Sequence, residues 1–199
     1  MPTPDQSLTR KLVAVGDGSV GKTCVLSVQH KNEFPQVYTP TVCEGFVTYV
    51  TVDDKLVELQ VWDTAGQESY NELRPLSYQH ASVILLCFSI DSRNSLINIK
   101  EKWYPELMLH CADVPIILVG NKTDLRDKFG SNLLTKDTNQ PLISYNEGKQ
   151  LAEDINARSY LECSAITNQG VDVIFEKATR VALERDQSTK EIRQYCWLL

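Results

Sequence analysis

The sequence of 199 residues has no long apolar run, no excess of basic residues and no closely paired cysteines. Its longest apolar runs, such as residues 83–88, are far too short to cross a bilayer, and its first ten residues lack the apolar stretch of a secretory signal. With 26 acidic and 20 basic residues it has no general attraction for DNA or RNA, so we expect no nucleic-acid partner. The six cysteines form no CxxC pair and no zinc-type Cys/His pair. We therefore expect one cytoplasmic domain with reduced thiols.

Short apolar runs alternate along the chain with longer segments of helical periodicity, which predicts an α/β fold. The predicted strands are residues 12–15, 46–52, 56–62, 83–90, 116–119 and 160–163, and the predicted helices include residues 92–110, 145–155 and 171–182. The second and third strands should form a hairpin that turns at Asp53 and Asp54, and Pro105 predicts a kink or an early end in its helix. The expected fold is a mostly parallel six-stranded sheet with one antiparallel edge strand and helices on both faces.

Residues 16–23, GDGSVGKT, follow the first strand and match the pattern GxxxxGK[ST] of a phosphate-binding loop, or P-loop. Glycines allow backbone N–H groups to surround phosphate oxygens, and the N-terminus of the next helix adds its dipole. Lys22 would reach the β- and γ-phosphates, and the Thr23 hydroxyl would bind Mg²⁺. The alternative, a glycine-rich turn with an unrelated lysine, does not explain the order of strand, loop and helix.

The segment Asp-Thr-Ala-Gly-Gln begins at Asp63, at the end of the third strand. The Asp63 carboxylate would hold Mg²⁺ directly or through water. The Gly66 N–H would approach a γ-phosphate, and the Gln67 amide would orient a water molecule. Without the P-loop upstream, the same residues would fit an ordinary turn equally well.

The segment Asn-Lys-Thr-Asp follows the fifth strand. The Asp124 carboxylate would accept two hydrogen bonds from the N1–H and 2-amino edge of guanine, which adenine cannot offer. The Asn121 amide would serve N7 or O6 and tie this loop to the P-loop, and the Lys122 stem would lie along the base. After the last strand come Ser164 and Ala165, whose backbone N–H would face guanine O6. The alternative is a polar loop in which Asp124 only caps a helix.

These four segments, in this order, resemble the Ras superfamily of small GTPases from about residue 10 onward. Three features are similar to the Rho family in particular. They are WDTAGQE running into LRPLSY within residues 62–78, the F-P-x-x-Y-x-P-T-V pattern at residues 34–42, and the 39 residues between Asp124 and Ser164. The last of these corresponds to the family's insert, here about residues 126–142. The resemblance implies a G domain over residues 1–183 and a tail over residues 184–199.

The resemblance also implies a slow GTPase that cycles between two states. Thr41 would bind Mg²⁺ and the γ-phosphate only with GTP, Phe34 would pack against the guanine edge, and Gly18 would leave room for an arginine from an activating protein. Catalysis would rest on Gln67, Lys22 and Thr41. The implied nucleotide-binding residues are Asp17, Gly18, Ser19, Val20, Gly21, Lys22, Thr23, Cys24, Phe34, Tyr38, Thr41, Gly66, Asn121, Lys122, Asp124, Ser164 and Ala165, and the implied metal ligands are Thr23, Thr41 and, through water, Asp63.

The implied partners are GTP and GDP, effectors, exchange factors, GTPase-activating proteins and a GDP-dissociation inhibitor. Relatives in this family commonly act on the actin cytoskeleton, which is an analogy from the family rather than from the residues. Two other readings stay open at this point. One is a GTP-binding module that cycles by exchange and barely hydrolyses, which the retained Gln67 and Gly18 disfavour. The other is a P-loop kinase or ATPase, which Asp124 disfavours.

Two positions and the insert depart from the family pattern. Ile166 stands where a lysine usually follows Ser-Ala, and Cys43 stands where relatives usually place phenylalanine. The pattern at residues 34–42 corresponds to the family's first switch. Together with Gly45, a small residue at position 43 predicts that this switch is more mobile and that nucleotide release is faster. The insert is rich in Gly, Asn and Pro, so we expect a largely irregular loop in place of a charged helix.

The last four residues, CWLL, match the prenylation pattern C-a-a-X, and leucine at the end favours a geranylgeranyl group on Cys196. Residues 184–195 are electrically neutral and hold no second cysteine, so we expect reversible membrane binding. The expected location is the cytoplasm and, after prenylation, the cytoplasmic face of the plasma membrane. A cysteine there by chance is the alternative.

Overall fold

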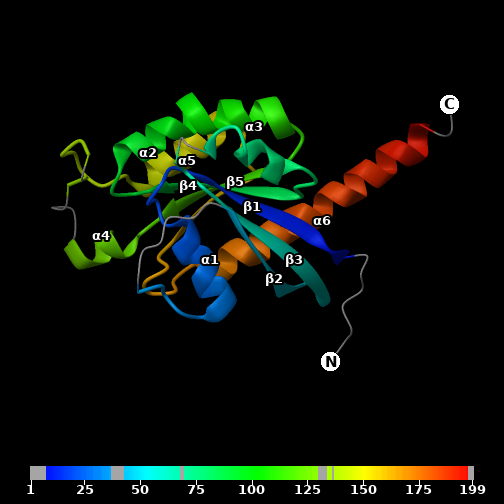
Figure 1. Cartoon of the computed structure of the whole chain (residues 1–199), viewed down its shortest axis with the longest axis horizontal. Coiled ribbons are helices and arrows are strands. Elements are labelled where there is room, and N and C mark those ends of the chain that lie inside the picture. The colour runs from blue at the N-terminus through cyan, green and yellow to red at the C-terminus, as the bar shows by residue number, and fades with distance from the viewer. Residues whose placement is uncertain (1–7, 37–42, 68–69, 130–133, 136, 197–199) are drawn as a thin grey trace.

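The structure, a computed structural model, describes residues 8–36, 43–67, 70–129, 134–135 and 137–196, with the backbone alone at 127, 129 and 186–196 (Figure 1). Its strands are β1 (Arg10–Gly16), β2 (Cys43–Val52), β3 (Lys55–Thr64), β4 (Val83–Ser89), β5 (Ile116–Asn121) and β6 (Ser159–Cys163). They form one sheet in the order β2-β3-β1-β4-β5-β6. Among these described strands, β2 and β3 pair antiparallel and the other pairs are parallel. The predicted mostly parallel sheet with one antiparallel edge strand is confirmed.

The hairpin between β2 and β3 turns at Asp53 and Asp54, as predicted. Both residues have positive φ angles, 49° and 61°, as in the two-residue turns whose twist matches that of antiparallel strands. Val52 pairs with Lys55 next to this turn, and at the far end Cys43 pairs with Thr64. The register therefore brings Cys43 to the carboxyl end of β3.

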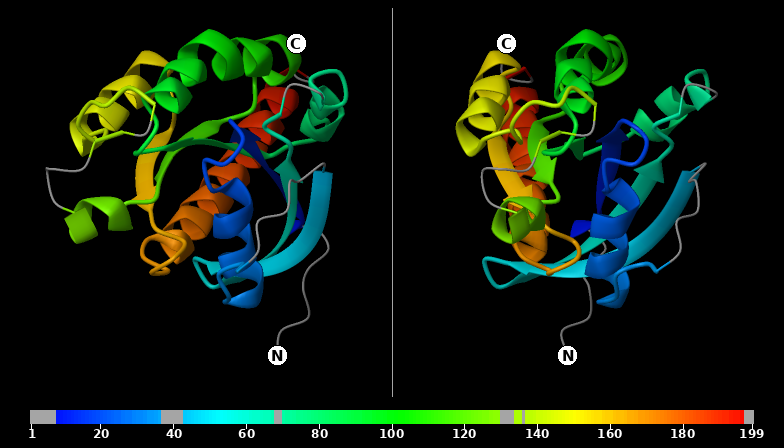
Figure 2. Two further views of the ribbon diagram at one scale, coloured as in Figure 1. Left: turned by 60° about the vertical axis from the view of Figure 1, so that its left-hand side comes forward. Right: turned by 90° about the vertical axis from the view of Figure 1, so that its left-hand side faces the viewer.

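Helices cover both faces of the sheet, as predicted. The helical segments are α1 (Lys22–Lys31), the 3₁₀ turn η3 (Arg74–Tyr78), α2 (Arg93–Asn98), the π-helical turn η4 (Ile99–Trp103), α3 (Tyr104–Cys111), α4 (Asp124–Phe129), α5 (Tyr145–Asp154) and α6 (Val171–Cys196). Leu12 and Ala14 of β1 pack in the core that includes α1 and α6, which lie against each other (Figure 2). Val13 and Val15 point to the opposite core, with η4, α3 and α5. Because successive side chains of β1 enter opposite cores, residues 12–15 are all apolar.

The helix predicted over residues 92–110 is a continuous helical stretch with an internal irregularity. It begins after Ser92, whose side chain accepts a hydrogen bond from the Ser95 N–H. The π-helical turn η4 lies immediately before α3, and Pro105 lies in the first turn of α3. Proline has no N–H to donate to the preceding turn, so the hydrogen-bonding pattern changes there. The predicted disturbance at Pro105 is therefore a π-helical turn, and the helix does not end early.

The other two predicted helices are confirmed. The helix α5 begins with a capping box, in which Ser144 and Glu147 each bind the other's backbone N–H. The helix α6 carries the predicted apolar stripe and continues past residue 182 to Cys196, so in Figure 1 it projects beyond the sheet. Within the described ranges, no helix is both long enough and apolar enough to cross a membrane.

The insert is attached to the first turn of α2. The Asp137 carboxylate accepts hydrogen bonds from the Ser92 hydroxyl at 2.7 Å and from the backbone N–H groups of Arg93 and Asn94 at 3.1 and 2.8 Å. The Arg93 guanidinium in turn donates to the Pro141 carbonyl at 3.1 Å. Partial burial acts to raise the pKa of Asp137, but these hydrogen bonds outweigh it and lower that pKa to about 2. An insert residue thus supplies the N-terminal cap of a helix 45 residues earlier in the chain.

We expect Asp137→Ala to lower the free energy of unfolding by about 0.5–1 kcal/mol near neutral pH, because two backbone donors of α2 lose their acceptor. A depressed carboxyl pKa stabilises the fold above its unfolded value of about 4, and this stabilisation disappears as the pH falls towards 2. The difference from the parent should therefore shrink over that range in urea titrations. Asp137→Asn keeps an acceptor without the charge, so its loss near neutral pH should be smaller. That loss should also shrink over the same range, because only the parent carries the titrating carboxyl group. A constant difference for Asp137→Ala would contradict this assignment.

Candidate functional site

The P-loop connects the end of β1 to the start of α1. Gly21 lies in the left-handed region with φ 98°, and Ser19 does so with φ 62°. The Lys22 ammonium turns back under this loop and donates to the carbonyl groups of Gly16 and Asp17, both at 2.8 Å. Lys22 is only 6 % exposed. Burial lowers the pKa of Lys22, and the nearby Asp63 carboxylate opposes this effect in part.

Two oxygen donors meet beside Lys22. The Thr23 hydroxyl donates to Asp63 Oδ2 at 2.5 Å, so the first turn of α1 and the end of β3 present a hydroxyl and a carboxylate at one point. Asp63 is held there by β3, whose next residue, Thr64, donates its hydroxyl to the Ala14 carbonyl at 2.7 Å. Hard oxygen ligands of this kind, few in number, suit Mg²⁺, which takes its other ligands from water and phosphate. The donor set therefore fits a magnesium ion.

Gly66 lies directly against the P-loop. A Cβ built on it would be 2.3 Å from the backbone of both Asp17 and Gly18, so only glycine fits without a backbone shift. Gln67, the next residue, is exposed. A Cβ built on Gly18 would meet no atom of the described residues within 4 Å. Gly66 and Gln67, which the family resemblance makes the start of the second switch, thus approach the P-loop backbone to backbone.

The loops after β5 and β6 are bound to each other and to the P-loop. The Asn121 amide donates to the Val20 carbonyl at 2.9 Å. The Ser164 hydroxyl donates to Asp124 Oδ1 at 2.7 Å, and both residues are buried. Ala165 follows Ser164 and is half-buried. The structure therefore brings together the residues that the sequence places in three separate segments.

Lys122 differs from its neighbours in that its ammonium makes a salt bridge at 3.2 Å to Asp91, at the end of β4. Its backbone is left-handed, with φ 68°. A cavity of about 280 Å³ lies between the P-loop, Lys122 and the start of α2. A second cavity, of about 170 Å³, lies on the Thr23 and Asp63 side of the P-loop. The expected nucleotide-binding residues thus border hollows on both sides of the P-loop.

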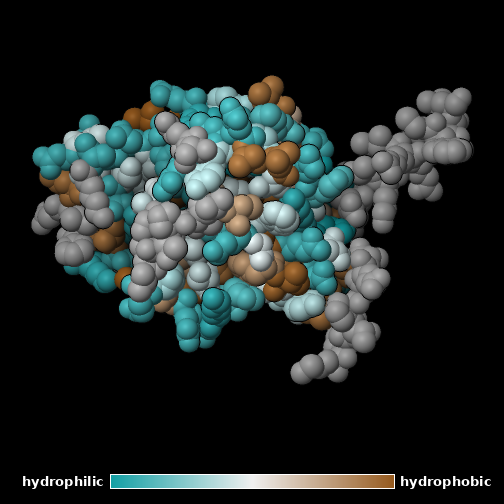
Figure 3. All heavy atoms as spheres, viewed as in Figure 1, coloured by the Kyte–Doolittle hydropathy of each residue, from teal (hydrophilic) through white to brown (hydrophobic). Residues whose placement is uncertain are grey.

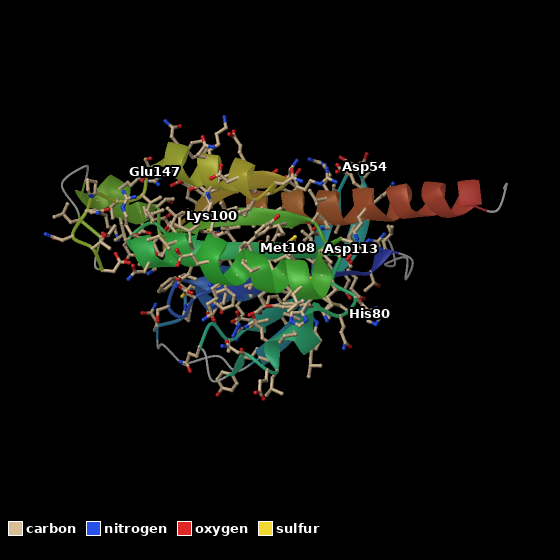
Figure 4. All side chains as sticks on the ribbon, turned by 90° about the horizontal axis from the view of Figure 1, so that it is seen from above. Asp54, His80, Lys100, Met108, Asp113 and Glu147 are labelled. Carbon is tan, nitrogen blue, oxygen red and sulfur yellow. The ribbon has the colours of Figure 1, made fainter. Side chains whose placement is uncertain are left out.

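A larger cavity, of about 790 Å³, lies elsewhere. It is bordered by α3, the residues before β5, the end of α5 and part of α6. In Figure 4, two of its residues, Met108 and Asp113, lie toward the end from which α6 projects, while Glu147 of α5 lies near the opposite end. Its lining contains no residue of the four loops, so its size does not make it the site.

Several expected site residues are placed differently or fall outside the description. The Asp17 carboxylate points away from the phosphate side, since it accepts hydrogen bonds from Asn98 and Trp103, each at 2.7 Å. Any contact of Asp17 with a nucleotide would therefore come from its backbone. Phe34 packs against the core beneath α1, and Cys24 is half-buried. Tyr38 and Thr41 lie outside the described residues.

Sequence reasoning missed two side chains that surround this site. Arg74 of η3 donates to the backbone carbonyls of Ala65 and Gln67. Trp103 of η4 donates to Asp17 of the P-loop. Nothing in the sequence indicates that Trp103 contacts the P-loop, because a tryptophan at a core-facing helical position is expected to pack in the core. The available hint of Arg74 was a charged residue directly between Leu73 and Pro75.

Comparisons with known proteins agree with this geometry. The model of the Ras family matches residues 11–184. A protein described as GTP-binding protein RHO1, from Candida albicans, is 53% identical over 192 residues, which cover 96% of this chain and 96% of that protein. The chain therefore belongs to the Ras superfamily of small GTPases and, within it, to the Rho family.

Proposed function

We propose that this protein binds GTP and GDP with Mg²⁺, hydrolyses GTP, and changes its affinity for effectors according to the nucleotide bound. The observation that carries the proposal is the junction of three loops: Asn121 bound to the P-loop at Val20, and Asp124 bound to Ser164. A carboxylate held in place by a neighbouring hydroxyl, next to a phosphate-binding loop, is what recognition of guanine requires. Membership of the Ras superfamily, with a relative described as GTP-binding, supports the same reading.

Guanine selection falls to Asp124. Its Oδ1 already accepts from Ser164, which holds the carboxylate in one orientation within a buried site. The remaining lone pairs can accept from guanine N1–H and its 2-amino group. Adenine would leave the buried carboxylate without these donors, and such a loss is costly. The Ala165 N–H would face O6, and Ile166 in place of the usual lysine leaves this backbone contact intact.

The phosphates would bind to the N–H groups of the P-loop and to Lys22. The ammonium now donates to the Gly16 and Asp17 carbonyls, so it is already held at the base of the loop. Thr23 and, through water, Asp63 would hold Mg²⁺, with Thr41 as a further ligand in the GTP state. The ion would offset negative charge on the β- and γ-phosphates. Thr23 Oγ1 and Asp63 Oδ2 are 2.5 Å apart, so these two oxygens already lie close enough together to serve one ion.

Hydrolysis would need a positioned water molecule more than a reactive side chain. The side-chain amide oxygen of Gln67 can accept a hydrogen bond from that water, and its side-chain N–H group can donate one. Gly66 brings the backbone of Gln67 next to the P-loop. We assign no arginine of this chain to the transition state, so intrinsic hydrolysis should be slow, and an arginine supplied in trans would speed it by roughly 10³–10⁵. The open space at Gly18 would admit such a residue.

Regulators and effectors would read the segments that respond to the γ-phosphate. Exposed apolar side chains lie near them: Val47 on β2, Leu73 just before η3, and Leu76 within it. Figure 3 shows brown patches over this side of the molecule. Contact with exchange factors, GTPase-activating proteins and a GDP-dissociation inhibitor belongs to this proposal. Prenylation at Cys196 and residence at the plasma membrane stay predictions from the sequence.

The exchange-driven alternative, a binding module with little hydrolysis, is not favoured. Gln67 and Gly18 are both present, and Gly66 is close enough to the P-loop to respond to a γ-phosphate. Measurement of phosphate release in a single turnover distinguishes the two.

We expect Asp124→Asn to lower affinity for GDP by about 10- to 100-fold, because it replaces a charged acceptor with a neutral amide. Affinity for xanthosine diphosphate should rise, because xanthine offers a carbonyl where guanine has its amino group. Competition against a fluorescent nucleotide measures both. Lys128→Ala is the matched control, since it removes the ion pair at 3.6 Å to the same carboxylate but leaves the acceptor intact. Unchanged preference for guanine in Asp124→Asn would rule out this role for Asp124.

We expect Cys43→Phe to slow the spontaneous release of GDP several-fold. Cys43 is exposed at the first position of β2, and its Sγ is 3.7 Å from the Ser77 hydroxyl of η3. A phenylalanine there would bury more apolar surface between the two switches and restrain the first of them. Cys43→Ser, nearly the same size, should release GDP like the parent. Equal rates for Cys43→Phe and the parent would mean that residue 43 does not control release.

A further inference from the structure

Arg74 is the centre of a buried polar network in the second switch. Its side chain is 1% exposed. Nε donates to the Ala65 carbonyl at 3.0 Å and Nη2 to the Gln67 carbonyl at 3.4 Å. These two carbonyl groups lie on either side of Gly66. The guanidinium therefore holds the segment 65–67 by its backbone.

The same guanidinium is anchored to α3. Nη1 pairs with the Glu106 carboxylate at 3.0 Å, and Nη2 donates to Asn71 Oδ1 at 2.5 Å. The Tyr78 hydroxyl also donates to Glu106. Burial, followed by the hydrogen bond to Glu106, raises the pKa of Tyr78, so this hydroxyl stays a donor. The Glu106 carboxylate thus accepts from both Arg74 and Tyr78, and it anchors the Arg74 guanidinium to α3.

Trp103 links this network to the P-loop. The Arg74 Cζ lies over the Trp103 ring, 4.5 Å from its centre. The indole N–H donates to Asp17 Oδ1 at 2.7 Å, and the Asn98 amide donates to Oδ2 at the same distance. Asp17 is the second residue of the P-loop. Arg74 therefore stacks on a ring that is bonded to the P-loop while it holds the switch segment that touches the P-loop.

A buried ion pair is seldom a net gain in stability, because the loss of hydration offsets the attraction. Two of the Arg74 hydrogen bonds go to backbone carbonyl groups of the segment that lies against the P-loop, and the others go to the Glu106 and Asn71 side chains. A network of this kind fixes geometry, and small displacements of a reacting group can slow catalysis by about 100-fold.

We propose that Arg74 is a positioning residue for GTP hydrolysis, which sets the distance of Gly66 and Gln67 from the P-loop through the carbonyl groups of Ala65 and Gln67. The proposal rests on the proposed role of Gln67 in orienting water. Arg74 does not touch nucleotide or water; it acts through the backbone of the residue that does.

The test compares Arg74→Lys with Tyr78→Phe in the full chain. Lysine keeps the charge beside Glu106, but a single ammonium cannot span both carbonyl groups and the carboxylate. We expect single-turnover GTP hydrolysis to fall about 10- to 100-fold while affinity for GDP changes little, since the P-loop and guanine contacts remain. Tyr78→Phe removes one donor to Glu106 without touching residues 65–67, and it should slow hydrolysis much less than Arg74→Lys.

Three outcomes would overturn the proposal: hydrolysis by Arg74→Lys at the parental rate, an equal slowing by Tyr78→Phe, or a fall in GDP affinity that matches the fall in hydrolysis. The last would mean a merely structural role. If Arg74→Lys does not fold, Glu106→Gln is the second variant. Glutamine keeps the shape of Glu106 but removes the charge that binds Arg74. A smaller slowing of hydrolysis with unchanged GDP affinity supports the proposal, whereas an unchanged rate of hydrolysis overturns it.

A double-mutant cycle with Gln67→Ala separates this proposal from the proposed function. If Gln67 orients water, Gln67→Ala alone slows hydrolysis; a parental rate would refute that role whatever Arg74 does. If Arg74 acts through Gln67, Arg74→Lys should add almost nothing in the Gln67→Ala background. An undiminished further loss there would show that Arg74 acts by another route and would overturn the proposal.

Discussion

The parallel pairing of β1 with β3 and β4, continued through β5 and β6, is the constraint on which the site depends. Parallel strands end at the same edge of a sheet, so the segments that follow β1, β3, β5 and β6 meet there although they are far apart in the sequence. Parallel strands also need cover on both faces, which α1 and α6 supply on one side and η4, α3 and α5 on the other. The apolar core and the polar edge are two results of one topology.

At that edge, buried polar groups are bonded to one another across loops. Lys22 binds P-loop carbonyls, Asn121 binds Val20, and Ser164 binds Asp124. Each bond satisfies a group that would otherwise be costly to bury, and the bonds of Asn121 and Ser164 also join segments that follow different strands. The loops are therefore held in position by the same contacts that satisfy them. Arg74 repeats this arrangement one layer out, between the second switch and α3.

Much of the fold was predictable because its signals are local. Strands such as β4 and β5 are continuously apolar, and the Asp53-Asp54 turn lies between two alternating segments. The site loops were predictable because each motif is a short stretch with a fixed place after a strand. The Asp17 side chain was not, because its partners, Asn98 and Trp103, lie 81 and 86 residues away. No local pattern encodes a contact that only the packing of η4 against the P-loop creates.

The cap on α2 was hidden for the same reason. The composition of the insert predicts an irregular loop, but composition carries no information about a hydrogen-bond partner 45 residues earlier in the chain. The π-helical turn η4 was foreseen only as a disturbance at Pro105. Its exact form depends on how Ile99 and Trp103 are buried, which is decided by the core.

The Asp137 cap makes the insert and the first turn of α2 thermodynamically linked. The three donors that Asp137 accepts from belong to Ser92, Arg93 and Asn94, and the same short helix ends at Asn98, which binds Asp17 of the P-loop. Free energy that orders the insert is therefore also free energy that orders α2, and the reverse holds by reciprocity. A ligand that binds the insert in a conformation with Asp137 bonded to α2 therefore stabilises α2, which is joined to the P-loop through Asn98. A ligand that binds a conformation without these bonds destabilises α2.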